Sequence, residues 1–355
     1  MLARLDNPPN PWSTTSVDWL GEPPPARLEV YLDASREILS ANDSPDLPFR
    51  FNVNPYRGCF HGCAYCYARP SHEYLSFGAG TDFERRIVVK PEAASLLRLA
   101  FDKPSWQGEL IALSGNTDCY QPLEAHYRLT RACLEVCRDY TNPVGVITKS
   151  PLIERDIDVL QALAARGAVR VTMSVPFARA DHARAIEPYV PPPARRIEAI
   201  RRLADAGVPV GVNVAPIIPG LNDAELPEVM ERAREAGASH AAYILLRLPG
   251  PVAGIFEQRL RAVLPLRAEK VLARIREVRG GGMNDARFGH RMRGEGVYAD
   301  TIHALFTRTA RRLGFESTRL EGVGVPNAPS PFQRPATPPP RPRGGDVDDP
   351  QLRLF

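Results

Sequence analysis

The sequence predicts an α/β fold in the form of a partial (β/α)6 barrel. Between about residues 49 and 250, short β-branched or apolar runs alternate with longer segments of helical periodicity, as in parallel strands joined by crossover helices. The chain has 355 residues and 44% hydrophobic content, which is enough to bury one large core. One barrel-sized domain with extensions is therefore preferred to a doubly wound sheet or to two smaller domains.

The predicted strands and helices follow one another along the chain. The strands are RFNVNPY (50–56), ELIALS (109–114), VGVITK (144–149), AVRVTMSV (168–175), PVGVNVAP (209–216) and HAAYILLRL (240–248). The helices, with apolar residues at i, i+3 and i+4, are LEAHYRLTRACLEVCRDY (123–140), IERDIDVLQALAARG (153–167), PARRIEAIRRLADAG (193–207) and DAELPEVMERAREAG (223–237). The first interval between strands is longer than the others, because a cysteine-rich loop and HEYLSFGAGTDFERRIVV (72–89) are inserted there.

The two flanks differ from the barrel in composition. Residues 1–48 are proline-rich and weakly periodic, and we expect an N-terminal arm that packs on the barrel or is partly disordered. Residues 326–350 are rich in Pro and Gly and poor in apolar side chains, which predicts a disordered linker. The barrel with its C-terminal cap is then residues 49–325, and the linker leads to an apolar pentapeptide, QLRLF (351–355).

The composition of the chain indicates its cellular compartment and the kinds of partner that it can bind. The first residues, MLARLDNPPNPWSTT, lack the apolar region of a secretory signal, and no apolar run approaches the roughly 18 residues that span a bilayer, so we expect a soluble, cytoplasmic protein without a membrane partner. Six cysteines in so long a chain, three of them within eight residues, favour metal binding over a disulfide framework. The net charge of +4 permits a nucleic-acid partner but indicates it only weakly.

The cysteine motif is CFHGCAYCYARP (59–70), in which Cys59, Cys63 and Cys66 are spaced C-x3-C-x2-C. A structural zinc or an electron-transfer cluster normally takes four protein ligands, and this motif supplies three. The motif therefore predicts a metal centre with one open coordination position. The alternatives are a zinc site completed by His61, whose bonded ring would strain so short a loop, and a loop of free buried thiols.

Polar residues follow each predicted strand. In a barrel of βα units the chemistry lies on the loops at the carboxyl ends of the strands, so these residues are expected to converge on one rim beside the cysteines. Lys149 stands out because the chain has only four lysines, and a cation at a strand end is a natural partner for a carboxylate. The residues are Ser114, Gly115, Asn116, Thr117 and Asp118 after the second strand, Thr148 and Lys149 after the third, Ser174 after the fourth, Asn213 after the fifth and Arg247 after the sixth.

The spacing C-x3-C-x2-C with Tyr65 before the last cysteine, on the loop after the first strand of a partial barrel, resembles the radical SAM superfamily. The resemblance implies that Cys59, Cys63 and Cys66 bind three irons of a [4Fe-4S] cluster. It also implies that S-adenosylmethionine binds the fourth iron and is cleaved by an electron from the cluster to a 5'-deoxyadenosyl radical that abstracts hydrogen. A reductase or flavodoxin-type electron donor is then an expected partner.

Within that superfamily, CAYCYARP, SGNTDCYQPLE, ITKSP, VTMSVP and APIIPGLND are most similar to the branch that contains spore photoproduct lyase, over roughly residues 49–300. The resemblance implies that Lys149 and Ser174 hold the carboxylate end or ribose of the cofactor, with Tyr65 also at the cofactor. It implies that residues 114–118 lie along the amino group of the cofactor. Tyr67, directly after the last cysteine, matches a tyrosine proposed as a radical relay.

The chain departs from that branch at the hydrogen donor. The branch places a donor cysteine just before the Asp of the second-strand motif, whereas this chain has Gly115 at the nearest equivalent position and Cys119 directly after Asp118. Cys119 is a relocated donor or a buried loop thiol. Cys133 and Cys137, four apart on a predicted helix, are core residues or, with Cys119, ligands of a second cluster.

Two C-terminal features bear on the substrate. The segment RGGGMNDARFGHRMRGEGVY (279–298) interleaves four arginines with two aromatic residues: Arg279, Arg287, Arg291 and Arg293 with Phe288 and Tyr298. Such a segment could contact a nucleic acid, or it could form a cap that closes the incomplete barrel. QLRLF resembles the peptide by which bacterial repair and replication proteins bind the sliding clamp. Gln351, Leu352, Leu354 and Phe355 would make that contact.

These features together predict a radical SAM enzyme that acts on nucleic acid, most plausibly on a DNA lesion. Two alternatives stay open: a radical SAM enzyme with a protein or metabolite substrate, and an iron-sulfur scaffold that does not cleave the cofactor.

Overall fold

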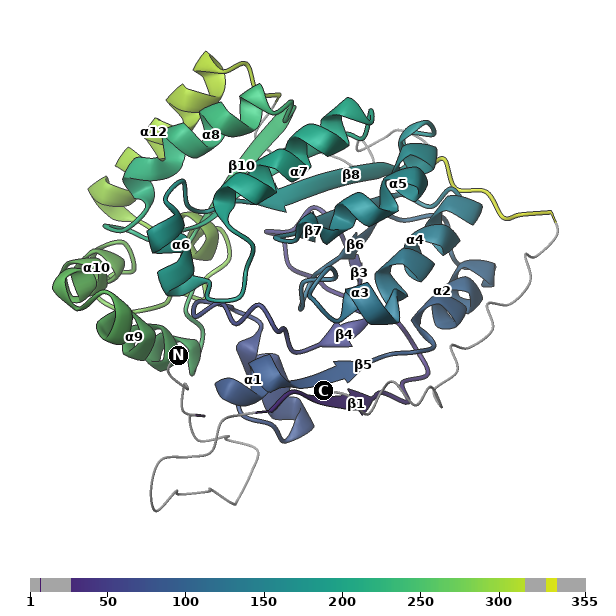
Figure 1. The fold of residues 1–355 in the computed structure, drawn as a ribbon, viewed down its shortest axis with the longest axis horizontal. Helices are drawn as coiled ribbons and strands as arrows, with labels where there is room; N and C mark the ends of the chain where they lie inside the picture. The colour runs from purple at the N-terminus through teal and green to yellow at the C-terminus, as the bar shows by residue number, and fades with distance from the viewer. Residues whose placement is uncertain (1–6, 8–26, 317–329, 337–355) are drawn as a thin grey trace.

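The computed structural model describes residues 7, 27–316 and 330–336. Its centre is a seven-stranded sheet in the order β10-β9-β8-β7-β6-β3-β2 (Figure 1). The strands are β2 (Leu39–Ala41), β3 (Phe51–Val53), β6 (Ile111–Leu113), β7 (Val144–Thr148), β8 (Val169–Ser174), β9 (Val210–Ile217) and β10 (His240–Leu245). All but β2 run parallel, and they are the six strands predicted from the sequence. Since β2 and β10 are the two edges, the sheet is open, as expected of a partial barrel.

The strands in the middle of the sheet are buried on both faces. In β8, every residue except Arg170 is buried, and Val and Ile supply three of the five residues of β7 and four of the eight of β9. Near-continuous apolar runs of this kind are typical of parallel strands that are covered by helices on one side and enclose a core on the other. The main core cluster joins these strands to the crossover helices.

The crossover helices occur where the periodicity predicts them. They are α2 (Ala93–Asp102), α3 (Glu124–Tyr127), α4 (Leu129–Asp139), α5 (Ile157–Ala164), α6 (Ala180–Ile186), α7 (Pro193–Asp205) and α8 (Leu226–Glu235), with short 3-10 turns η2 (Pro151–Asp156) and η3 (Asp223–Glu225) before α5 and α8. The single helix predicted over 123–140 is wrong. Arg128 adopts φ 54°, and the Glu124 carboxylate accepts hydrogen bonds from the amides of Thr130 (2.9 Å) and Arg131 (3.2 Å). This side chain caps a new helix, so α3 ends and α4 begins.

The long first interval forms a second, smaller sheet beside the main one. It consists of β1 (Glu29–Leu32), β5 (Arg86–Val89) and β4 (Tyr56–Arg57) in the order β1-β5-β4, with η1 (Arg69–Leu75) and α1 (Thr81–Arg85) before β5. Residues 27–48 of the N-terminal arm supply β1 to this sheet and β2 to the main sheet. The arm is therefore packed over these residues, one of the two outcomes expected.

The segments after β10 cover the end of the sheet. They include α9 (Val252–Val263), α10 (Pro265–Glu277), α11 (His290–Arg293) and α12 (Gly296–Arg312), the last of which packs beside α8 (Figure 1). No helix in the described part of the chain is both long and apolar enough to cross a lipid bilayer.

The arginine-rich segment after α10 is largely occupied in holding this cap together. Arg279 is buried and donates to backbone carbonyls of β10 and of the residue after it, while Arg287 pairs with Asp285 (2.7 Å) and Arg291 with Asp46 (2.5 Å). Three of the four arginines therefore have partners within the fold. This favours the cap over the nucleic-acid interpretation for the segment as a whole.

Residues 330–336 differ from the linker predicted for 326–350. Phe332 packs against Phe101 and Tyr140, and the Arg334 guanidinium donates to the carbonyls of Lys103 (2.7 Å) and Trp106 (2.8 Å). Composition hid these contacts because one aromatic and one arginine side chain are enough to fix a short segment. The rest of the predicted linker and residues 351–355 lie outside the described residues.

Candidate active site

The cysteine loop follows β4 and is held at its base by backbone and side-chain hydrogen bonds. The amide of Cys59 donates to the carbonyl of Phe83 (2.8 Å), and the amide of Ala64 donates to that of Ile186 (3.1 Å). The buried side chain of Gln121 accepts from the amide of Phe60 (3.0 Å) and donates to the carbonyl of Gly58 (3.2 Å). Gln121, which sequence reasoning missed, therefore connects the cysteine loop to the loop after β6.

Arg69, three residues after the last cysteine, fixes the loop from inside. Its fully buried guanidinium donates to the carbonyl of Cys63 (2.9 and 3.1 Å) and pairs with Glu84 (2.5 Å). Gly62 has φ 64°, and a Cβ atom there would lie 2.9 Å from the ring of Tyr189. Glycine is required at this position because both the backbone conformation and the space exclude a side chain.

The geometry of the three thiols fits a cluster better than a single ion. Tetrahedral zinc with bonds of about 2.3 Å brings its sulfur ligands to about 3.8 Å from one another. Across residues 27–316 and 330–336, no three Cys, His, Asp or Glu ligand atoms lie within 4.8 Å of one another except those of Asp285, His290 and Glu295. At least one pair of the sulfurs of Cys59, Cys63 and Cys66 is therefore wider than a zinc ion allows, as expected when each thiolate binds a different iron.

The three cysteines form no disulfides and are free to bind a metal. Burial, opposed in part by nearby cations, raises the pKa of Cys66 to about 11 and that of Cys63 well above its usual value. Burial raises the pKa of Cys119, Cys133 and Cys137 in the same direction, so the motif spacing, and not the pKa, sets the first three cysteines apart. A bound cation would stabilise their thiolates.

Asp118 joins the cysteine loop to two strand ends. Its buried carboxylate accepts from the Thr148 hydroxyl (2.6 Å) and the Lys149 amide (2.8 Å), and it lies 3.4 Å from Nδ1 of His61. Although burial raises the pKa of Asp118, the charge of His61 and these hydrogen bonds lower it to about 2. His61 thus faces the Asp118 carboxylate through Nδ1, an arrangement that free and metal-binding histidines share; what disfavours the zinc site is the separation of the possible ligand atoms in the described residues.

The rest of the loop after β6 rests on the two asparagines of NVNPY. A Cβ atom on Gly115 would lie 3.1 Å from Asn52, and the amide of Asn116 donates to Oδ1 of Asn54 (2.8 Å). The hydroxyl of Tyr67 donates to the carbonyl of Gly115 (2.7 Å). Asn52 and Asn54 were not predicted as site residues, yet they set the path of this loop.

Tyr65, Lys149 and Ser174 are brought together by a fully buried ion pair. Arg196 donates to Glu187 (2.5 Å) and to the carbonyl of Ser174 (3.0 Å), and the second oxygen of Glu187 accepts from the Tyr65 hydroxyl. The ammonium of Lys149 lies 5.7 Å from the ring centroid of Tyr65, and among the described residues no carboxylate pairs with it. Glu187 and Arg196 gave no sequence signal, because they lie in a helix and a loop that read as scaffold.

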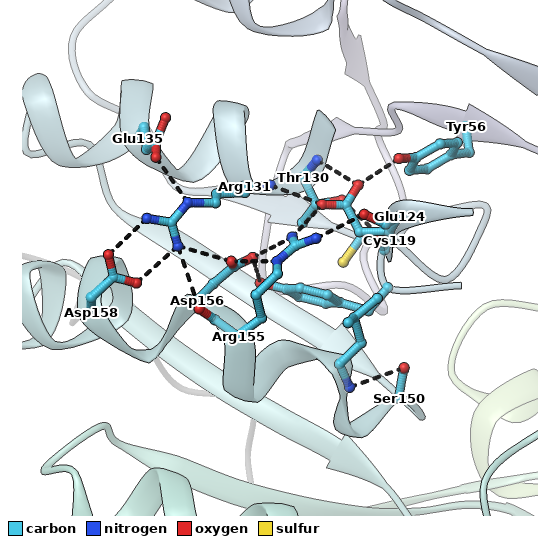
Figure 2. Close-up of polar contacts among 12 residues, drawn as sticks. Tyr56, Cys119, Glu124, Thr130, Arg131, Glu135, Ser150, Arg155, Asp156 and Asp158 are labelled. Carbon is cyan, nitrogen blue, oxygen red and sulfur yellow. Dashed lines mark hydrogen bonds and ion pairs between the residues drawn. The ribbon is translucent and has the colours of Figure 1, made fainter. Parts of the chain in front are cut away.

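Cys119 lies on the other side of the loop, in the main core. Figure 2 shows it among the polar contacts of Glu124, Arg131, Arg155 and Asp156, where Glu124 and Arg155 (2.6 Å) form one of the ion pairs. Its side chain is 1% exposed, and its carbonyl accepts from the Thr130 hydroxyl (2.6 Å). This burial favours the packing interpretation of Cys119 over that of a hydrogen donor.

Cys133 and Cys137 are also fully buried members of the main core cluster. Their placement favours the core interpretation over a second cluster.

Several buried polar atoms at the carboxyl side of the sheet have no hydrogen-bond partner among the residues that the structure describes. They are Oγ1 of Thr117, Oδ1 of Asn213 and Nε of Arg247. Asn213 lies within β9, further from the strand end than predicted, but it is paired in register with Ser174 at the end of β8. Buried polar atoms are almost always hydrogen-bonded, so these atoms fit a polar ligand bound at this rim.

Comparisons with known proteins agree with the fold and the motif. The family model described as Radical SAM superfamily matches residues 53–233. "Uncharacterized protein Rv2578c" of Mycobacterium tuberculosis is 38% identical over 212 residues, which are 59% of this chain and 62% of that protein. "Uncharacterized protein MJ0683" of Methanocaldococcus jannaschii is 29% identical over 200 residues, 56% of this chain and 72% of that protein. The chain thus spans less than two thirds of the mycobacterial relative.

Among solved structures, spore photoproduct lyase complexed with dinucleoside spore photoproduct superimposes with a TM-score of 0.58. The match covers 81% of this chain and 80% of that one, at 16% sequence identity. At this identity the likeness concerns the fold alone.

The ion pair below Tyr65 gives a prediction about stability. Arg196→Lys should lower the free energy of unfolding by on the order of 3 kcal/mol, because a lysine cannot serve Glu187 and the carbonyl of Ser174 together in a buried site. Arg201→Lys on the same helix, at an exposed pair with Glu198, should change it by less than about 0.5 kcal/mol. Urea unfolding of both variants measures the difference, and equal losses would contradict the role given to Arg196.

Proposed function

The chain belongs to the radical SAM superfamily, and from this premise we propose that it reductively cleaves S-adenosylmethionine at a [4Fe-4S] cluster bound by Cys59, Cys63 and Cys66. The observation that carries the proposal is the C-x3-C-x2-C motif, which supplies three of the four ligands that a [4Fe-4S] cluster takes and whose sulfurs do not all lie within 4.8 Å of one another in the described structure. When bound, the reduced cluster supplies the electron that converts the cofactor to methionine and a 5'-deoxyadenosyl radical.

The residues around the cysteines would hold the cofactor. Lys149, a cation without a carboxylate partner in the described residues, would bind the carboxylate of the cofactor, and its amide is fixed by Asp118. Thr117 and Asn213 offer unpaired polar atoms to the amino group and the ribose, beside Ser174. The burial of this rim would exclude water from a reactive radical.

The substrate that we propose is nucleic acid, and in particular damaged DNA. The proposal is supported by the likeness of the fold to spore photoproduct lyase, a protein solved with a dinucleoside photoproduct. The displaced cysteine argues against the same hydrogen donor. Tyr67, half-exposed beside Cys66, is better placed as a radical carrier than the buried Cys119. A cytoplasmic location and a flavodoxin-type electron donor belong to the same proposal.

The sliding clamp is the partner that we propose for QLRLF (351–355). The described segment closest to it, residues 330–336, packs near the amino ends of β6 and β7, away from the cysteine loop. Deleting residues 351–355 should abolish binding to a bacterial sliding clamp. Arg353→Ala should preserve binding, because Arg353 is not one of the four contact residues. Surface plasmon resonance on immobilised clamp measures both variants, and unchanged binding by the deletion variant would remove this partner.

The cluster assignment is tested by a matched pair of buried cysteines. After anaerobic reconstitution, the wild-type chain and Cys137→Ala should carry about four irons and release 5'-deoxyadenosine with dithionite and S-adenosylmethionine. Cys63→Ala should lose most of the iron and all of the product. Retention of both by Cys63→Ala, or their loss in Cys137→Ala, would refute the assignment.

The same assay with ultraviolet-irradiated DNA separates the functional alternatives. Stimulation by irradiated over unirradiated DNA supports repair. Cofactor cleavage that ignores DNA favours a protein or metabolite substrate, and iron binding without cleavage favours a scaffold.

A further inference from the structure

We propose that Arg247 forms a separate anion subsite at the open side of the cluster, where it binds a backbone phosphate of the substrate. The inference rests on the proposed function and adds the substrate contact to it. Lys149 would bind the carboxylate of the cofactor, and Arg247 would bind a phosphate of the substrate.

Arg247 is a half-buried cation whose charge is not compensated by an ion pair. It lies two residues beyond the end of β10, and its Nη1 has only the weak acceptor Sδ of Met292 (3.8 Å), while its Nε is buried without a partner. Over residues 27–316 and 330–336, no carboxylate lies within 4.0 Å of it. The other buried arginines at the site, Arg69 and Arg196, are each paired with a glutamate.

The nearest acid is already engaged. Asp46 accepts from the guanidinium of Arg291 (2.5 Å) and from the amide of Gly289 (2.8 Å). Burial, followed by the charge of Arg291, lowers the pKa of Arg247, although a guanidinium remains protonated at neutral pH. An unpaired buried charge is costly, so a ligand anion would stabilise this arrangement.

The two tyrosines on either side of Cys66 differ in exposure, and each lies against one of the two cations. Lys149 lies 5.7 Å from the ring centroid of Tyr65 and Arg247 lies 5.6 Å from that of Tyr67. Tyr65 is 7% exposed, whereas Tyr67 is 49% exposed. The inner cation is therefore placed for a small ligand enclosed at the cluster, and the outer cation for a larger ligand that remains partly in solvent.

The chemistry of the outer cation suits a phosphodiester. A guanidinium offers a planar fork of donors that matches two phosphate oxygens. Phe288, which is 55% exposed and stacks on Arg291 at 4.4 Å, offers an aromatic face to a base near the same end of the barrel. Aromatic stacking beside a cation is how proteins bind single-stranded or everted nucleotides.

The test compares Arg247→Gln with Arg287→Gln, an exposed arginine that loses the same charge but is paired with Asp285 and Glu295. Reconstituted proteins are titrated with fluorescein-labelled dT12 by anisotropy at several salt concentrations, and with S-adenosylmethionine by equilibrium dialysis. Arg247→Gln should weaken dT12 binding about tenfold and reduce the salt slope by about 0.7, the value for one phosphate on a single strand. Iron content and cofactor affinity should stay as in wild type, and Arg247→Lys should recover part of the dT12 affinity.

The first two of the following results overturn the proposal, and the third leaves the decision on the subsite to a second ligand. If Arg247→Gln weakens cofactor binding instead, Arg247 belongs to the cofactor carboxylate. If both glutamine variants lose dT12 affinity equally, the loss comes from the lower net positive charge of the protein and not from a specific site at Arg247. If the wild-type protein binds no dT12, the proposal of a nucleic-acid substrate fails. Calorimetry with inorganic pyrophosphate then tests the anion subsite alone. The subsite is retained if wild type binds pyrophosphate and Arg247→Gln does not, and it is rejected if wild type does not bind pyrophosphate.

Discussion

The buried carboxylate of Asp118 is the interaction on which the arrangement of the site depends. It accepts from the hydroxyl of Thr148 and the amide of Lys149 and faces the ring of His61. It stays ionised in spite of its burial because these groups lower its pKa to about 2. One side chain thereby fixes the cysteine loop, the loop after β6 and the end of β7 relative to one another. It acts together with Gln121 and Tyr67, which also join the cysteine loop to the loop after β6.

The rest of the cysteine loop is also held by buried charged side chains that pair with a side chain of opposite charge within the protein. Arg69 with Glu84 fixes the loop from one side, and Arg196 with Glu187 fixes Tyr65 and the end of β8 from the other. Against this background, Lys149 and Arg247 differ because neither has an internal acid in the described residues. Compensated charges position the site, and the uncompensated charges are those available to ligands.

Much of the fold could be predicted from the sequence. The six parallel strands follow from short apolar runs that alternate with helical segments, whereas the cysteine ligands remain a prediction from local spacing. Predictions failed where a single long-range contact decides the structure. The Glu124 carboxylate breaks the helix predicted over 123–140, and Phe332 and Arg334 fix a segment whose composition indicates disorder. Asn52, Gln121 and Glu187 were missed for the same reason, because their partners lie far away in the sequence. The arginines after α10 were ambiguous until their acidic partners were located.

The proposed function requires one iron of the cluster to be bound by S-adenosylmethionine and not by a protein side chain. The most direct measurement is electron-nuclear double resonance on the reduced, reconstituted protein with S-adenosylmethionine labelled with nitrogen-15 at the amino group and oxygen-17 at the carboxylate. The account predicts hyperfine couplings from both labels, with the cluster signal altered by the cofactor. A cluster signal that does not change with the cofactor and shows no coupling to either label would contradict it.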